Sequence, residues 1–246
     1  MDLHILLILA MIGLFVGLAK TAISGFGLLA VTLCVSIIPA RESTGVMLML
    51  LLVGDLFAIR IYKNFVEWKF IRSLLVPVAF GICIGAVFLA QSTDLELKKF
   101  IGWLVIVLVG TFVMSKLFPL SSKSMNLRLT HILGSILGTM SGFMSAVANA
   151  GGTPMGIYLF LRKNEKKIFM GNSAWFFFIV NLSKVPIVFF LNLLHLASIR
   201  YLIIPLPFIF LGAFLGKRVL EKIDQNLFQN VTLFSSFLVG LRLIFS

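Results

Sequence analysis

Charged residues are scarce in this chain. Asp, Glu, Lys and Arg make up 12% of its 246 residues, whereas about 25% is usual for a soluble domain. Hydrophobic residues make up 60% of the chain. This balance excludes a soluble globular enzyme, because a core of this size cannot bury so much apolar surface. It also excludes a disordered chain, which needs low hydrophobicity.

Cysteine and histidine are also rare, and enzyme signatures are missing. Cys34 and Cys83 lie inside apolar runs and predict no disulfide scaffold. His4, His131 and His195 are too far apart in the sequence to indicate a metal site. The chain has no His-Glu-x-x-His, Gly-x-Ser-x-Gly or Walker motif. We therefore expect neither an enzyme nor a cofactor.

The chain consists mainly of long, continuous apolar runs. Its mean hydropathy is +1.09, and most runs have about the 20 residues that one membrane-spanning helix needs. A transmembrane β-barrel is excluded because its strands alternate apolar and polar residues. We expect an all-α polytopic membrane protein that contacts lipid. The runs cover residues 3–38, 43–61, 70–90, 99–118, 127–161, 168–192, 198–217 and 226–245.

The runs 3–38 and 127–161 are too long for one crossing. Each would form a helix of roughly 50 Å, whereas the hydrocarbon core is about 30 Å thick. Small and polar residues, which can end a helix, interrupt both runs. We therefore expect broken or re-entrant helices there. The interruptions are Lys20-Thr21-Ala22-Ile23-Ser24-Gly25-Phe26-Gly27 and Asn149-Ala150-Gly151-Gly152-Thr153-Pro154.

The positions of Lys and Arg test whether the chain turns back at these breaks. If both long runs turn back, 14 of these residues lie on one side of the membrane and 5 on the other. Such a bias marks cytoplasmic loops, so the net charge of +12 does not require a nucleic-acid partner. The same split arises if only the second run turns back. Charge therefore predicts the second break and leaves the first open.

A weak internal repeat predicts the first break. At an offset of 125 residues, Gly13, Gly17 and Gly27 align with Gly138, Gly142 and Gly152, and at 126 Asp55 aligns with Asn181. We interpret 1–118 and 127–246 as two transmembrane repeats of about five segments each, joined by a cytoplasmic linker at 119–126. Because five is odd, the second repeat would be inverted relative to the first, with both termini outside.

Several glycines recur at four-residue spacing, a pattern that lets helix backbones approach closely. We expect these faces to pack helices within the chain, and a homodimer contact is the alternative. The spacings are Gly13/Gly17, Gly81/Gly85, Gly134/Gly138/Gly142 and Gly212/Gly216.

Each break is followed by a predicted half-helix, over 27–38 and 153–161, the second with Thr153 as N-cap. Non-helical backbone at membrane depth must face protein or a cavity, and a helix N-terminus attracts anions. We expect the breaks to meet near the midplane and form one anion site, although packing kinks are the alternative. The candidate residues are Ser24, Gly25, Gly27, Asn149, Gly151, Gly152 and Thr153.

Polar residues within other runs add to this candidate site. Lys184 could bind an anion or form a structural pair with Asp55, which could also take up a proton. Asn172 and Asn181 could line the cavity or join helices.

These residues are similar to those of a known family. The two breaks, together with Gly54-Asp55-Leu56 and Asn181-Leu182-Ser183-Lys184-Val185-Pro186, resemble the TauE/SafE family. The resemblance implies transport of sulfite, sulfoacetate or another organosulfonate across the bacterial inner membrane. The first break departs from the family pattern because Leu28 and Leu29 follow Gly27. We therefore expect a secondary transporter for a small anion, working by alternating access, with a passive channel or a non-transporting scaffold subunit as alternatives.

The predicted orientation can be tested by cysteine labelling. In a cysteine-free background, Asp2→Cys should react with a membrane-impermeant thiol reagent in intact cells, because the first run turns back. Asn164→Cys, in the predicted cytoplasmic loop 162–167, should react only after permeabilisation. Labelling of position 2 only after permeabilisation would mean that the first run crosses once and that the repeat is not inverted.

Overall fold

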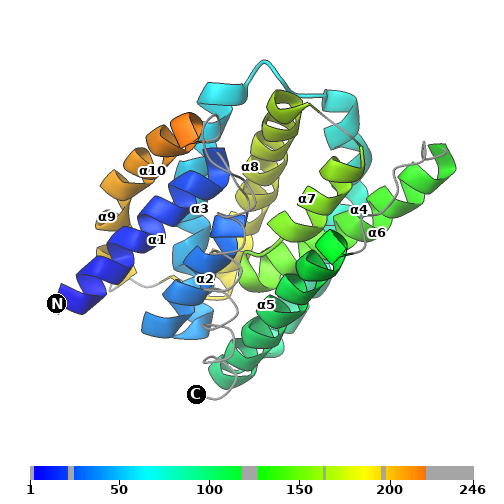
Figure 1. The fold of residues 1–246 in the computed structure, drawn as a ribbon. Coiled ribbons are helices and arrows are strands. Elements are labelled where there is room, and N and C mark those ends of the chain that lie inside the picture. The colour runs from blue at the N-terminus through cyan, green and yellow to red at the C-terminus, as the bar shows by residue number, and fades with distance from the viewer. Residues whose placement is uncertain (1–2, 22–24, 118–126, 163–164, 195–197, 220–246) are drawn as a thin grey trace.

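The computed structural model describes residues 3–21, 25–117, 127–162, 165–194 and 198–219 (Figure 1), and these residues are helical without strands. The predicted linker 119–126 and the last apolar run, 226–245, lie outside them. The helices are α1 Leu3–Thr21, α2 Gly25–Ile37, α3 Ala40–Tyr62, α4 Trp68–Gln91, α5 Asp94–Leu117, α6 Leu127–Ala148, α7 Gly152–Leu161, α8 Lys166–Phe190, α9 Ile199–Ile203 and α10 Pro205–Val219.

Six helical segments of the described chain are long and apolar enough to cross a membrane. Five of them belong to α1, α3, α4, α6 and α8, and the sixth, Tyr201–Arg218, continues from the short α9 through α10. Phe26–Ile37 is a shorter apolar helix. The chain is thus an all-α, multi-pass membrane protein, as its apolar runs predict.

Both overlong runs are divided into a long helix and a short one. The first run forms α1 and α2, and the second forms α6 and α7. The prediction that Thr153 caps the second half-helix is wrong, because α7 already begins at Gly152. The carbonyl of Gly151 instead accepts the first helical hydrogen bond, from the amide of Met155 at 3.4 Å. Thr153 therefore lies inside the helix.

The helices of the two sequence halves are interleaved rather than packed as separate bundles. Helix α1 lies along α10 at one end of the molecule, α4 lies along α6 at the other, and α3 packs against α8 between them (Figure 1). Each half thus contributes one long helix to a pair with the other half. The short helices α2 and α7 are also in contact.

Close contacts between glycine and backbone hold the two outer pairs together. A Cβ atom at Gly17 in α1 would lie 2.3 Å from the carbonyl oxygen of Ile209 in α10, and one at Gly142 in α6 would lie 2.2 Å from that of Val78 in α4. A helix can approach another this closely only where the side chain is missing. Gly17 and Gly142 form one of the glycine pairs that the repeat aligns, and the two members of this pair make equivalent contacts.

The partner helices make matched contacts in return. A Cβ atom at Gly212 in α10 would lie 2.2 Å from the carbonyl oxygen of Leu14, and one at Gly81 in α4 would lie 2.0 Å from that of Thr139. Leu14 and Thr139 are again 125 residues apart. These glycine faces therefore pack helices within one chain, as expected.

A glycine-to-alanine pair tests this packing. Gly142→Ala should lower the free energy of unfolding by about 1–3 kcal/mol, because the added methyl group overlaps the carbonyl of Val78. Gly110→Ala in α5 is the control, since the described chain has no atom within 4 Å of a Cβ there. That change should be neutral or slightly stabilising, because alanine favours a helix. Denaturant unfolding in mixed micelles measures both. Equal stability of the two variants would contradict the close α4–α6 contact.

Candidate functional site

Asp55 forms the centre of a buried polar contact between three helices. Its side chain, on α3, is completely buried. Oδ1 lies 2.6 Å from Nζ of Lys20, on the last turn of α1. Oδ2 accepts a hydrogen bond of 2.6 Å from Nδ2 of Asn181 on α8. Asp55 and Asn181 are the pair that the repeat aligns at offset 126, and here they contact each other across the α3–α8 crossing.

Lys184 lies one turn beyond Asn181 on α8 and is 3% exposed. Its ammonium group donates to the carbonyl oxygen of Ser145 at 2.8 Å, to Oγ of Ser145 at 2.9 Å and to Oδ1 of Asn149 at 2.8 Å. These three acceptors use the three donors of an ammonium group, and all of them are neutral. No carboxylate of the described chain forms an ion pair with Lys184, although Asp55 and Lys20 are close enough to interact with it electrostatically.

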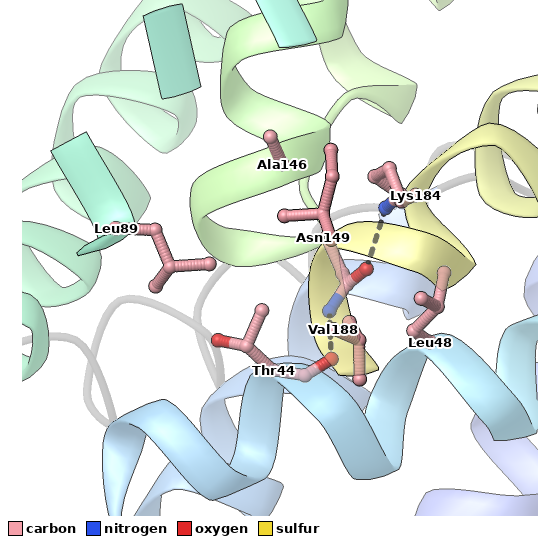
Figure 2. Close-up of a pocket in the computed structure, with 8 residues that line it drawn as sticks. Thr44, Leu48, Leu89, Ala146, Asn149, Lys184 and Val188 are labelled. Atoms are coloured by element: carbon pink, nitrogen blue, oxygen red, sulfur yellow. Dashed lines mark hydrogen bonds between the residues drawn. The ribbon is translucent and has the colours of Figure 1, made fainter. Parts of the chain in front are cut away.

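Asn149 positions the second break with both its backbone and its side chain. Its φ is 52°, a left-handed conformation that asparagine tolerates better than most residues. The amide of Ala150 donates back to the carbonyl of Met144 at 3.1 Å, which closes the end of α6. The side chain then accepts from Lys184 and donates to the carbonyl of Thr44 on α3 at 2.9 Å. Figure 2 shows Asn149 between these two residues, so it links α8 to α3.

The start of α7 is held close to α6. Oγ of Ser141 donates to the carbonyl oxygen of Gly151 at 2.8 Å. A Cβ atom at position 151 would lie 2.5 Å from the carbonyl oxygen of Ser141, so a larger residue would push the two segments apart. The half-helix therefore begins in a fixed place, next to Asn149 and Lys184.

A small cavity adjoins the second break (Figure 2). Its volume is about 10 Å³, close to what one water molecule occupies. In this conformation the cavity is too small for an oxyanion. The lining residues are Thr44, Leu48, Leu89, Ala146, Asn149, Lys184, Ile187 and Val188.

The described residues of the first break do not line this cavity. Gly25 and Gly27 are in the first turn of α2 and do not line that cavity. Ser24 lies outside the described residues. The hydroxyl of Tyr62 on α3 donates to the carbonyl oxygen of Thr21 at 2.9 Å, which supplies a partner at the end of α1. The contact between α2 and α7 brings the two half-helices together.

Asn172 is not part of the contact of Asp55 with Lys20 and Asn181, although the sequence analysis grouped it with Asn181. Its Oδ1 accepts from the backbone amide of Glu67 at 2.7 Å, and its Nδ2 donates to Oε2 of Glu67 at 3.1 Å. Arg162 lies 3.3 Å from the same carboxylate. Asn172 therefore joins the α3–α4 turn to α8, and Arg162 joins it to the end of α7. Of the two roles expected for Asn172, joining helices is the one observed.

Sequence reasoning placed Lys20 in the first break but did not propose it, or Ser145, as a site residue. It considered a pair between Asp55 and Lys184, whereas the ion pair of Asp55 is with Lys20. The repeat could have found both residues, because Lys20 and Ser145 are 125 residues apart and each stands in the last turn before a break. Each also contacts an ionisable residue of the long helix that follows its half-helix, Asp55 on α3 or Lys184 on α8.

The ion pair can be tested by removing one partner and then both. Lys20→Met should lower the free energy of unfolding by about 3–5 kcal/mol, because it leaves Asp55 buried without a counter-charge. Adding Asp55→Asn removes both charges and should restore most of that loss. Lys99→Met, at an exposed lysine on α5, should change stability by less than about 0.5 kcal/mol. A double variant no more stable than Lys20→Met would mean that the pair is not coupled.

Comparison with known proteins assigns the chain to a family. No curated protein and no solved structure matches it. The family model described as "Sulfite exporter TauE/SafE" matches residues 9–243, which include both breaks, the Asp55 cluster and Lys184. The chain therefore belongs to the TauE/SafE sulfite exporter family of membrane transporters, the family that its two breaks resemble.

Proposed function

We propose that this protein is a secondary transporter that carries a small, sulfur-containing anion, such as sulfite or an organosulfonate, across the inner membrane by alternating access. The observation that carries the proposal is the Lys184 ammonium group, which is buried beside a helix break and bonded only to neutral acceptors. Membership of the sulfite exporter family supports the substrate class.

A buried ammonium group with neutral partners favours an anion electrostatically. Its hydrogen bonds to Ser145 and Asn149 satisfy its donors but do not cancel its charge. A charge in a low-dielectric interior is costly until an opposite charge comes near it. An anion that replaces one of the neutral acceptors would therefore stabilise Lys184. The amide groups of Gly152 and Thr153, at the start of α7, would add a favourable helix dipole.

The interleaved halves support alternating access between inverted repeats. Gly45 and Gly171, which are 126 residues apart, both lie close to a backbone carbonyl of the other half: their Cβ atoms would be 2.4 Å from the carbonyl oxygens of Leu193 and Phe65, respectively. Together with the matched contacts of α1–α10 and α4–α6, this is the relation expected for repeats around a pseudo-two-fold axis in the membrane plane. Such halves can exchange conformations, so that one site opens to each side in turn.

The size of the cavity favours a transporter over a channel. The cavity beside Lys184 has a volume of only about 10 Å³, which supports a transporter whose site must open to take up an anion rather than an open channel. Asp55 is the one fully buried carboxylate of the described chain, and it is the group that could take up a proton if transport is proton-coupled. The charge distribution favours the second turn-back, and the internal repeat, which favours the first, then gives an orientation with both termini outside.

Substitution of Lys184 tests the anion site. In wild type, sulfite or 2-hydroxyethanesulfonate at 100 times its Kd should stabilise the folded protein by about 2.7 kcal/mol. Lys184→Ala should abolish this stabilisation because it removes the positive charge. Lys184→Arg should retain part of it, because the charge stays but the guanidinium group is wider. Thermal unfolding in detergent measures the shift, and Lys99→Ala should behave as wild type.

Counterflow in proteoliposomes then separates the transporter from its alternatives. A transporter exchanges labelled against unlabelled anion, and Lys184→Ala should lose that exchange. Flux without counterflow would indicate a channel, and absence of any flux would indicate a scaffold. An unchanged ligand-induced shift in Lys184→Ala would remove Lys184 from the binding site.

A further inference from the structure

Three ionisable side chains lie together in the interior next to the two breaks. Lys20 and Lys184 are basic and Asp55 is acidic, and their side chains range from fully buried to 11% exposed. Lys20 and Asp55 are paired at 2.6 Å, whereas Lys184 is held by neutral groups. With all three ionised, this cluster has one positive charge in excess within the described chain.

That excess charge is costly in a membrane interior. Charged residues among membrane-spanning helices are tolerated when they pair with an opposite charge or face a polar cavity. Lys184 has three hydrogen bonds, so its donors are satisfied. No counter-ion in the described part of the chain neutralises its positive charge. The nearest space is the cavity that Lys184 and Asn149 line together (Figure 2). A ligand placed there with one negative charge would make the cluster neutral.

We propose that Asp55 sets the charge of the transported ion. By neutralising Lys20, it leaves one free positive charge, so the cluster selects a monovalent anion, such as hydrogen sulfite or a monosulfonate, over a divalent one. This inference rests on the proposed function and adds the valence of the substrate. Without Asp55, both lysines would be free and a divalent anion would match the site better. Asp55 is therefore a specificity-determining residue, although its carboxylate contacts Lys20 and Asn181 rather than Lys184.

The selection can be measured with three ligands of nearly equal size. Taurine has no net charge, 2-hydroxyethanesulfonate has one negative charge and sulfoacetate has two at neutral pH. All three carry a sulfonate on a two-carbon chain, so they differ chiefly in charge. Binding to the full-length protein is measured by thermal shift in detergent, and transport by counterflow in proteoliposomes. Wild type should bind 2-hydroxyethanesulfonate at least about tenfold more tightly than either of the others, a factor that corresponds to about 1.4 kcal/mol.

Two single variants should change this preference in opposite ways. Asp55→Asn raises the excess to two positive charges and should make sulfoacetate the preferred ligand. Ser145→Asp places a carboxylate where the serine hydroxyl lies 2.9 Å from the Lys184 ammonium group, which lowers the excess to zero. It should remove the preference for 2-hydroxyethanesulfonate over taurine. Because Ser145→Asp leaves the Lys20–Asp55 pair intact, it remains informative if Asp55→Asn alone fails to fold.

The double variant Asp55→Asn/Ser145→Asp is the matched control. It has one excess positive charge again, with Lys184 now paired and Lys20 free. A return of the preference for 2-hydroxyethanesulfonate would show that the charge of the whole cluster decides valence. A wild-type protein that transports 2-hydroxyethanesulfonate and sulfoacetate equally well, or the same ligand order in every variant, would overturn this inference and leave the proposed function standing. A wild-type protein that binds and transports no anion would overturn both.

Discussion

The contact of the Asp55 carboxylate with Lys20 and Asn181 is the interaction on which the centre of this molecule depends. It joins α1 and α3 of the first half to α8 of the second. A carboxylate in a low-dielectric interior tolerates few arrangements, because every lost partner leaves an uncompensated charge. The end of α1 must therefore stay beside α3.

The sequence predicted the features that follow from length and from glycine. Runs of 36 and 35 residues cannot cross a bilayer once without a break, and both are divided near the expected residues. Two aligned glycine pairs, Gly17/Gly142 and Gly45/Gly171, make close contacts with backbone carbonyls. The alignment of Asp55 with Asn181 also placed those two side chains at equivalent positions, where they bond to each other.

Side-chain direction could not be predicted in the same way. Asn172 and Asn181 lie on one helix and look alike in sequence, yet only Asn181 reaches Asp55, while Asn172 holds Glu67. The choice between Lys20 and Lys184 as the partner of Asp55 depended on which helix packs against which, and that is a property of the tertiary structure. Thr153 was predicted to cap α7, but the helix already begins at Gly152. Its start lies where Gly151 approaches Ser141 closely, and not at the threonine hydroxyl.

The pairing of α1 with α10 affects how the protein must fold during synthesis. Helix α1 is made before the other described helices, and its partner α10 follows more than 180 residues later. Until then the face around Gly17 lacks the helix that it packs against in the folded protein. Helix α4, in contrast, can pair as soon as α5 and α6 have been made. The α4–α6 pair can therefore form while the chain is still growing, and the α1–α10 pair forms later. Damage to the α10 face would uncover the glycine face of α1, more than 180 residues earlier in the sequence.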